Sequence, residues 1–175
     1  MNSKGRGLDL ARLILRTTVG GTMIAHGMKH GRTLDGTAGW FGSIGFRRPR
    51  LQAQASAVVE VGAGALLVAG AATPLSAAAV IGTMAVAARS VHMRKGFFIT
   101  GEGYEFVLNL GAATAALAAL GPGKYSVDRA LGMDRRLSGV PAAATATAVA
   151  VGIGSAAAQL ATFWTEPQPT SATTA

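Results

Sequence analysis

The sequence contains no cysteine, few charged residues and few aromatic residues, and each shortage narrows the class of protein. Without cysteine, the chain has no disulfide scaffold, no thiolate metal site and no cysteine-based redox step of its own. Charged residues make up 14% of the chain, against about a quarter in an ordinary soluble domain. Half of the residues are hydrophobic, which excludes intrinsic disorder, yet only 6% are aromatic. The apolar mass is therefore mostly Ala, Val, Leu and Gly.

The charged residues that are present avoid three long windows, at residues 61–88, 106–123 and 137–165. A helix that spans a bilayer needs about 20 predominantly apolar residues. An Ala-rich soluble bundle would instead show a polar stripe every three to four residues, and these windows show none. We therefore expect an all-α integral membrane bundle, in contact with the lipid bilayer. The predicted helices cover residues 8–27, 51–73, 75–93, 103–120 and 140–164.

The connecting segments divide the chain further. Thr73-Pro74 predicts a tight helical hairpin, because Pro starts a helix well and continues one badly. Residues 28–50 combine glycines with Trp40 and Phe41, which favours an interfacial loop. The predicted divisions are a basic segment at 1–7, a four-helix core at 8–131, a linker with a fifth hydrophobic helix at 132–164, and a disordered tail at 165–175. The sets 111/115/119 and 148/152/156 consist of Gly and Ala and predict close helix packing.

The positions of the basic residues bear on the orientation in the membrane and on nucleic acid as a partner. With five spans, eight Lys or Arg residues fall on each face, so their number does not decide the topology. The basic front of the first helix and Arg135-Arg136 before the last one favour a cytoplasmic N-terminus in a multi-pass protein of the cell membrane. The basic residues are spread over several short loops and form no nucleic-acid motif. We therefore expect no nucleic-acid partner.

Ionisable residues inside apolar helices are costly, so each is a functional candidate. Alternating helices bring the end of the first helix, the end of the third and the start of the fourth to one face, and Glu60 could approach from below. Arg16 comes from the other face as a counter-ion for Glu60, with Arg89 or His92 as the alternative, and Gly62 and Gly64 leave room beside the carboxylate. The candidate ligand-binding residues are Arg16, His26, Lys29, Glu60, Arg89, His92, Glu102, Tyr104, Glu105 and Asn109.

These residues leave several interpretations open. They can form buried ion pairs that only fix helix order, a polar cavity for a quinone headgroup or a similar small molecule, or a proton pathway. His26 and His30, four residues apart, with His92 as a third ligand, can be arranged around a metal, although helix-end histidines more often meet carbonyls or headgroups, so no metal is expected. No catalytic residue can be named.

Several short motifs, taken in order, resemble the DoxX family of small multi-pass membrane proteins. They are Arg12 and Arg16, residues 26–30, Trp40-Phe41, Glu60 with Gly62 and Gly64, residues 73–75, residues 101–105 and residues 121–128. The resemblance covers residues 8–131 and implies a four-helix membrane core. The fifth hydrophobic segment lies outside that core and could dock a partner or a second copy, making a homo-oligomer.

What the resemblance implies about function is an association with oxidoreductase systems, either quinone-linked or concerned with thiol balance and oxidative stress. The main hypothesis is therefore a membrane subunit of such a system, with a quinone in its polar cavity and membrane oxidoreductases as partners. In it, Glu60 and Glu105 handle protons, Arg89 and His92 bind carbonyl oxygens, and Tyr104 lines the mouth. The alternative is a non-enzymatic scaffold or a small-molecule-binding subunit of a larger complex, and a transporter is a third reading.

Overall fold

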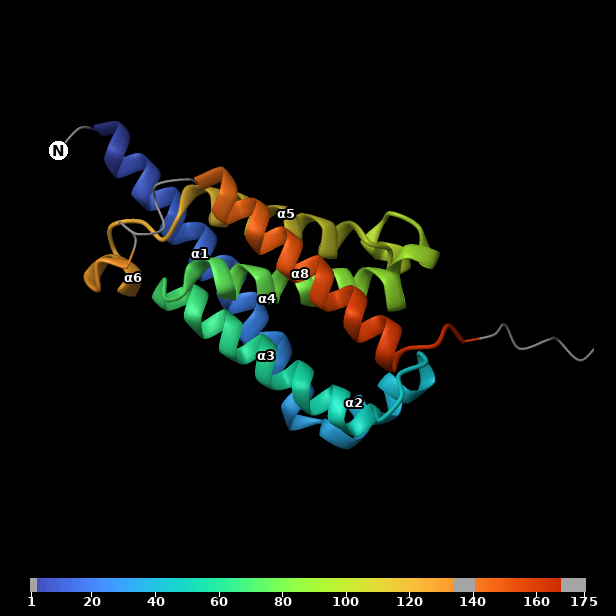
Figure 1. Ribbon diagram of the computed structural model, residues 1–175. Coiled ribbons are helices and arrows are strands. Elements are labelled where there is room, and N and C mark those ends of the chain that lie inside the picture. Colours follow the sequence, from blue (N-terminus) through green and yellow to red (C-terminus); the bar gives the residue numbers. More distant parts are fainter. Residues whose placement is uncertain (1–2, 134–140, 168–175) are drawn as a thin grey trace, which may run out of the picture.

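The computed structural model describes residues 3–133 and 141–167 as a bundle of helices (Figure 1). The long helices are α1 (Ser3–Arg32), α3 (Pro49–Ala69), α4 (Thr73–Ala87), α5 (Glu105–Leu120) and α8 (Pro141–Phe163). The short ones are α2 (Leu34–Ser43), the π-helical turn η1 (Ala88–His92), the 3-10 turns η2 (Met93–Lys95) and η3 (Ile99–Gly101), and α6 (Val127–Ala130). Within the described residues there is no strand, and one isolated bridge joins Phe46 to Trp164. The all-α prediction is confirmed.

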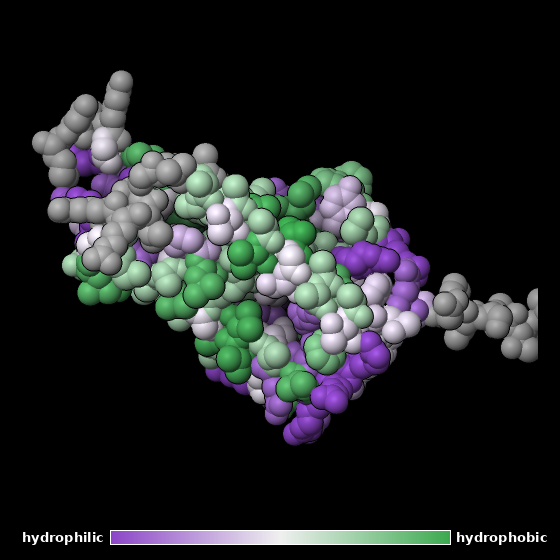
Figure 2. All heavy atoms as spheres, viewed as in Figure 1, coloured by the Kyte–Doolittle hydropathy of each residue, from purple (hydrophilic) through white to green (hydrophobic). Residues whose placement is uncertain are grey.

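Three helical segments are long and apolar enough to cross a membrane: Pro49–Ala69, Thr73–Lys95 and Ala143–Phe163. The second of these is α4 with its π-helical and 3-10 continuation, while α5 is apolar but shorter. On the face shown in Figure 2, hydrophobic side chains cover the middle of the molecule and hydrophilic ones gather towards its ends. The chain is thus a helical membrane protein.

Glycines bring α1 and α3 into backbone contact. A Cβ atom on Gly64 would lie 2.6 Å from Gly20 O, and one on Gly20 would lie 2.6 Å from Gly64 O. Gly64 therefore serves helix packing. The sequence had suggested instead that Gly64 makes room beside Glu60. Gly62 has nothing within 4 Å of such an atom.

The fifth hydrophobic helix, α8, packs on α4 and α5 of its own chain. Ala148 and Ala156 are buried, and a Cβ on Gly152 would lie 2.6 Å from Ala78 O. Close packing by this set is confirmed. The set at 111, 115 and 119 behaves differently, because Gly111 and Ala115 line an open apolar groove instead.

Residues 28–50 differ from the interfacial loop expected there. The first helix continues to Arg32, and α2 follows almost directly. Phe41 and Phe46 turn inwards and are buried, whereas Trp40 is 44% exposed. The aromatic residues thus close the bundle at this end. The disordered tail predicted at 165–175 falls mostly on residues outside the described part of the chain, as do residues 134–140 of the linker before α8.

Two arginines, one helical turn apart on α1, bind the ends of other helices at the opposite end of the bundle. Arg16 donates to the carbonyls of Leu67 and Val68, in the last turn of α3, and also to those of Pro122 and Tyr125. Arg12 donates to Leu120 O, the last residue of α5. Carbonyls at a helix C-terminus have no partner within the helix and favour a nearby cation. These arginines therefore fasten three helices together.

Candidate functional site

A pocket of about 400 Å³ lies at the end of the bundle where α1 meets α2, and we name it the Glu60 pocket. Its volume lies within the range of small-molecule sites. Side chains from α1, α2, α3, α4 and its π-helical continuation, and α8 all contribute to it. The lining residues are His30, Trp40, Phe41, Ile44, Phe46, Leu51, Gln52, Ala55, Ser56, Val59, Glu60, Thr83, Val86, Ala87, Ser90, Val91, Gln159 and Phe163.

The most polar feature of the Glu60 pocket is a group of three side chains from α1 and α3. Glu60 is only 4% exposed, and its Oε1 accepts a hydrogen bond from Ser56 Oγ. His30 Nδ1 lies 3.2 Å from the same oxygen and 3.5 Å from Ser56 Oγ. The other oxygen, Oε2, is buried and has no hydrogen-bond partner among the described residues. The group therefore has one carboxyl oxygen in use and one unpaired.

A second polar contact joins α3 to α8 in the same pocket. Gln159 Nε2 donates to Gln52 Oε1 at 2.8 Å. Each amide carries both donors and acceptors, so the pair keeps hydrogen-bonding capacity beyond this bond. Through Gln159, the fifth helix α8 contributes a polar side chain to the wall of the pocket.

Aromatic rings form much of the remaining wall. Trp40 and Phe41 pack edge to face at 5.3 Å, and the centroids of Phe41 and Phe46 are 5.1 Å apart. His30 faces the first two rings, with centroid separations of 6.5 Å to Trp40 and 6.4 Å to Phe41. An apolar, aromatic wall with a few polar groups is typical of small-molecule sites.

The end of α8 is fastened to the loop before α3, which closes one side of the pocket. Trp164 Nε1 donates to Ile44 O at 2.8 Å, and the backbone of Thr165 and Gly45 is joined at 3.0 Å. Arg89 lies over the Trp164 ring, 4.7 Å from its centroid. It also pairs with Glu166 at 3.0 Å. Arg89 therefore holds the end of α8 in place.

Arg16 and Glu60 do not pair, and that prediction is wrong. The guanidinium of Arg16 is taken up by four backbone carbonyls, as described above. Its carbonyl partners on α3 lie seven and eight residues beyond Glu60, about 10 to 12 Å further along the helix. The alternatives Arg89 and His92 are also wrong as partners, because Glu60 bonds with Ser56 and His30.

The ionisable residues expected to meet at one face are divided between separate places. His92 Nδ1 lies 2.6 Å from Glu102 O, and Lys95 pairs with the Glu102 carboxylate. Glu105 Oε2 accepts from Ile99 N at 2.9 Å. These contacts build the loop before α5. The Lys95 hydrogen bond, and then its charge, lower the pKa of Glu102 below its usual value, with a smaller contribution from His92.

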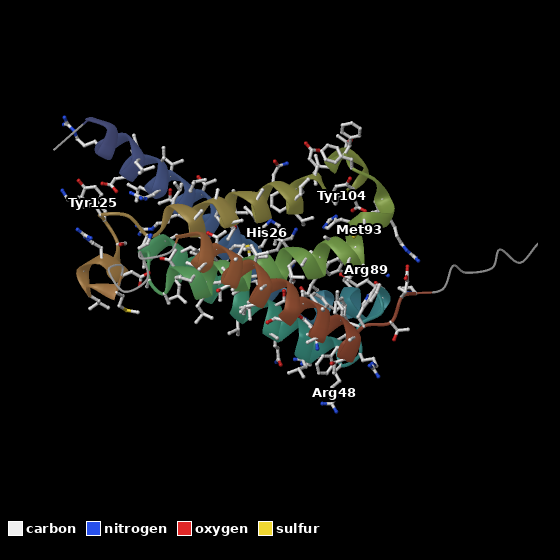
Figure 3. The ribbon with its side chains drawn as sticks, turned by 45° about the horizontal axis from the view of Figure 1, so that its top comes forward. His26, Arg48, Arg89, Met93, Tyr104 and Tyr125 are labelled. Atoms are coloured by element: carbon white, nitrogen blue, oxygen red, sulfur yellow. The ribbon has the colours of Figure 1, made fainter. Side chains whose placement is uncertain are left out.

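The other candidates lie outside the Glu60 pocket. His26 is exposed and stacks on Phe106, with centroids 5.7 Å apart, and Lys29 is exposed in the last turn of α1. Tyr104 lines the apolar groove between α4, α5 and α8. Figure 3 shows Tyr104 at the end of the molecule opposite Tyr125. Asn109 donates to Glu105 O within its own helix. Of the predicted site residues, Glu60 is the one that lines this pocket.

The sequence contained a signal for the missed residues. Gln52, Ser56 and Glu60 are spaced by four and so share one face of α3, a polar stripe inside an apolar helix. Gln159 is the comparable polar residue within the last charge-free window. His30 was considered only as a metal ligand, and among the described residues no three His, Cys, Asp or Glu side chains gather as a metal site.

The fold and this site define a class: a helical membrane protein with a buried carboxylate beside an aromatic pocket. Residues 11–93 match the model of the DoxX family. This match confirms, over residues 11–93, the resemblance to the DoxX family that the sequence motifs indicated. The match includes His30, Ser56 and Glu60, and it ends before the loop that contains Glu102 and before α8. No curated protein and no solved structure matches this chain.

Proposed function

We propose that the Glu60 pocket binds a small ring-shaped molecule of the quinone type, and that the protein serves as a membrane subunit of an oxidoreductase system. The observation that carries this proposal is the pairing of aromatic walls with the His30–Ser56–Glu60 group in one cavity of about 400 Å³. The rings suit a flat apolar ligand. The polar group suits the oxygen atoms at its edge.

The chain is proposed to bind this molecule and to leave electron transfer to a partner. It has no cysteine, so thiol chemistry has to take place on a substrate or on another protein. This division of labour joins the oxidoreductase hypothesis to its alternative, a small-molecule-binding subunit of a larger complex. Purification in mild detergent, followed by mass spectrometry of the proteins and quinones that co-purify, tests the association.

Binding itself is tested by filling the pocket. Val59 lines the Glu60 pocket, whereas its neighbour Val58 lies in a different surface groove and is 72% exposed. In lipid nanodiscs, Val59→Trp should weaken binding of decyl-ubiquinone at least tenfold, because the indole occupies the cavity. The matched control Val58→Trp should bind as the wild type does. Equilibrium dialysis gives both affinities, and absence of saturable binding of both decyl-ubiquinone and its reduced form by the wild-type protein refutes the proposal.

The orientation in the cell membrane is also proposed, with the N-terminus cytoplasmic. The basic front of α1 supports this topology. In that orientation the Glu60 pocket lies towards the outer face, because it is at the far end of α1. Alkaline phosphatase fused after Ala175 should be active and a fluorescent protein at the same position dark. The reverse pattern refutes the orientation, or shows that the number of spans is even.

A further inference from the structure

We infer that the Glu60 pocket selects a ligand that offers a hydroxyl group, and so binds the reduced, dihydroxy form of a quinone-type ring more tightly than the oxidised, dicarbonyl form. This inference rests on the proposed function, since it names the chemical state of the ligand at the same site. It follows from the hydrogen-bonding capacity that Glu60 has left over.

Two hydrogen-bond donors converge on one oxygen of Glu60. Ser56 Oγ donates to Oε1, and His30 Nδ1 lies 3.2 Å from the same atom. With its hydrogen on Nδ1, the imidazole donates to Oε1 as Ser56 does. Oε2 remains a buried acceptor with no donor among the described residues. A buried acceptor without a donor is unfavourable, and the ligand in the adjoining pocket is the group that can supply one.

The carboxyl group can present this oxygen to the pocket. The outermost torsion of a Glu side chain is broad, so the carboxyl group can turn by less than a half-turn at little cost. Glu60 itself lines the pocket. A modest rotation therefore brings an unpaired acceptor to the surface of the cavity while Ser56 and His30 remain within reach.

The two forms of the ligand meet this acceptor differently. A dicarbonyl ring has only acceptor oxygens, so its lone pairs would face those of Glu60. A dihydroxy ring donates an O–H, and a hydrogen bond to a carboxylate is among the stronger ones in proteins. Failure to pair a buried polar group is a larger source of discrimination than a change in apolar contact. Glu60 thus favours the reduced form.

The second polar contact in the pocket does not oppose this preference. Gln52 and Gln159 form an amide pair, and an amide both donates and accepts. Such a pair accommodates either a hydroxyl or a carbonyl oxygen at the other edge of the ring. The choice between the two forms therefore depends on Glu60, and the aromatic walls, which contact the ring faces, are common to both.

The test compares decyl-ubiquinol with decyl-ubiquinone under anaerobic conditions in nanodiscs. The wild-type protein should bind the quinol at least tenfold more tightly. Glu60→Gln keeps the shape but places an amide donor where the acceptor was, so the ratio should fall to one or reverse. The matched control Glu102→Gln, an exposed residue in the loop before α5, should keep the wild-type ratio.

A measurement without any variant protects the test against a failure of Glu60→Gln to fold. Tenfold tighter binding of the reduced form raises the two-electron midpoint potential of the bound ligand by about 30 mV. A redox titration of the wild-type protein in nanodiscs, monitored by ligand absorbance, gives this shift. Equal affinities with an unchanged potential overturn the inference and leave the proposed function standing. Absence of binding by both forms refutes the proposed function instead.

Discussion

The carboxylate of Asp128 accepts two hydrogen bonds from Thr73, one from its backbone N–H at 2.9 Å and one from its hydroxyl at 2.8 Å. The N–H of Ala72 donates to the other carboxylate oxygen at 2.7 Å. These N–H groups open α4, where a negative charge is favoured. Asp128 is 1% exposed. A residue of the short helix α6 therefore caps the start of α4 from a distant part of the chain.

Asp128→Ala should destabilise the protein by about 3 kcal/mol, because it leaves buried donors at the start of α4 without an acceptor. Denaturation in detergent gives the change in the free energy of unfolding. Asp35→Ala is the control, since Asp35 pairs with Arg50 on the surface and such pairs contribute little. Equal stability of the two variants would contradict the capping role.

Arg16→Met should lower stability by at least about 3 kcal/mol, since the apolar chain keeps the volume but abandons the carbonyls at the end of α3 and in the segment after α5. The thermal midpoint and the free energy of unfolding should fall together. Arg32→Met removes an exposed arginine from the same helix and should be nearly neutral. If ligand binding were lost in Arg16→Met while stability stayed intact, Arg16 would belong to the binding site after all.

Gly64→Ala should destabilise the contact between α1 and α3 by roughly 1 to 3 kcal/mol, because the added methyl group would lie too close to Gly20 O. Gly62→Ala, two residues earlier on the same helix, has space for its methyl group. It should be neutral or slightly stabilising, because Ala favours a helix over Gly. A melting curve for each variant, measured in the same detergent, decides between close packing and a tolerant interface.

Lys95→Met should raise the pKa of Glu102 towards its usual value, because the pKa of this carboxyl is lowered first by the Lys95 side-chain hydrogen bond and then by the Lys95 charge. A carboxyl whose pKa is lower in the folded protein adds stability above its unfolded pKa, and this contribution is lost as the pH falls through the folded pKa. The variant should therefore lack this contribution above the unfolded pKa, and any difference in stability from the wild type should disappear as the pH falls below the folded pKa. The chemical shift of the Glu102 carboxyl carbon, followed against pH, gives the pKa of this group. An unchanged pKa in the variant would refute the role of Lys95.

The helices were predictable from the sequence, and their contacts only in part. Predicted segments 51–73, 75–93, 103–120 and 140–164 correspond to α3, α4 with its continuation, α5 and α8. Charge-free windows, and proline or glycine at their boundaries, are properties of the local sequence, so they locate helices well. The segment at 28–50 was misread because aromatic and glycine content does not distinguish an interfacial loop from a short helix that packs its rings inwards.

Of the residues in the candidate site, the sequence analysis predicted Glu60 but not its hydrogen-bond partners. A carboxylate deep in an apolar helix stands out in any sequence. Its partner His30 did not, because His26 lies one turn earlier on the same face of α1 and nothing local indicates which of the two lies level with Glu60. The close approach at Gly20 and Gly64 decides the rotation of α1, and with it the position of His30.

The sequence by itself determined that this chain is a helical membrane protein with a DoxX-like segment, because apolar length, lack of charge and the order of motifs can all be read along the chain. Only the tertiary structure decided which polar groups meet. Spacing by four places Gln52, Ser56 and Glu60 on one face of a helix, but the neighbour of that face depends on how each helix rotates and tilts. Backbone contacts between distant glycines settle that geometry, and so they place Arg16 on helix-end carbonyls and His30 beside Glu60.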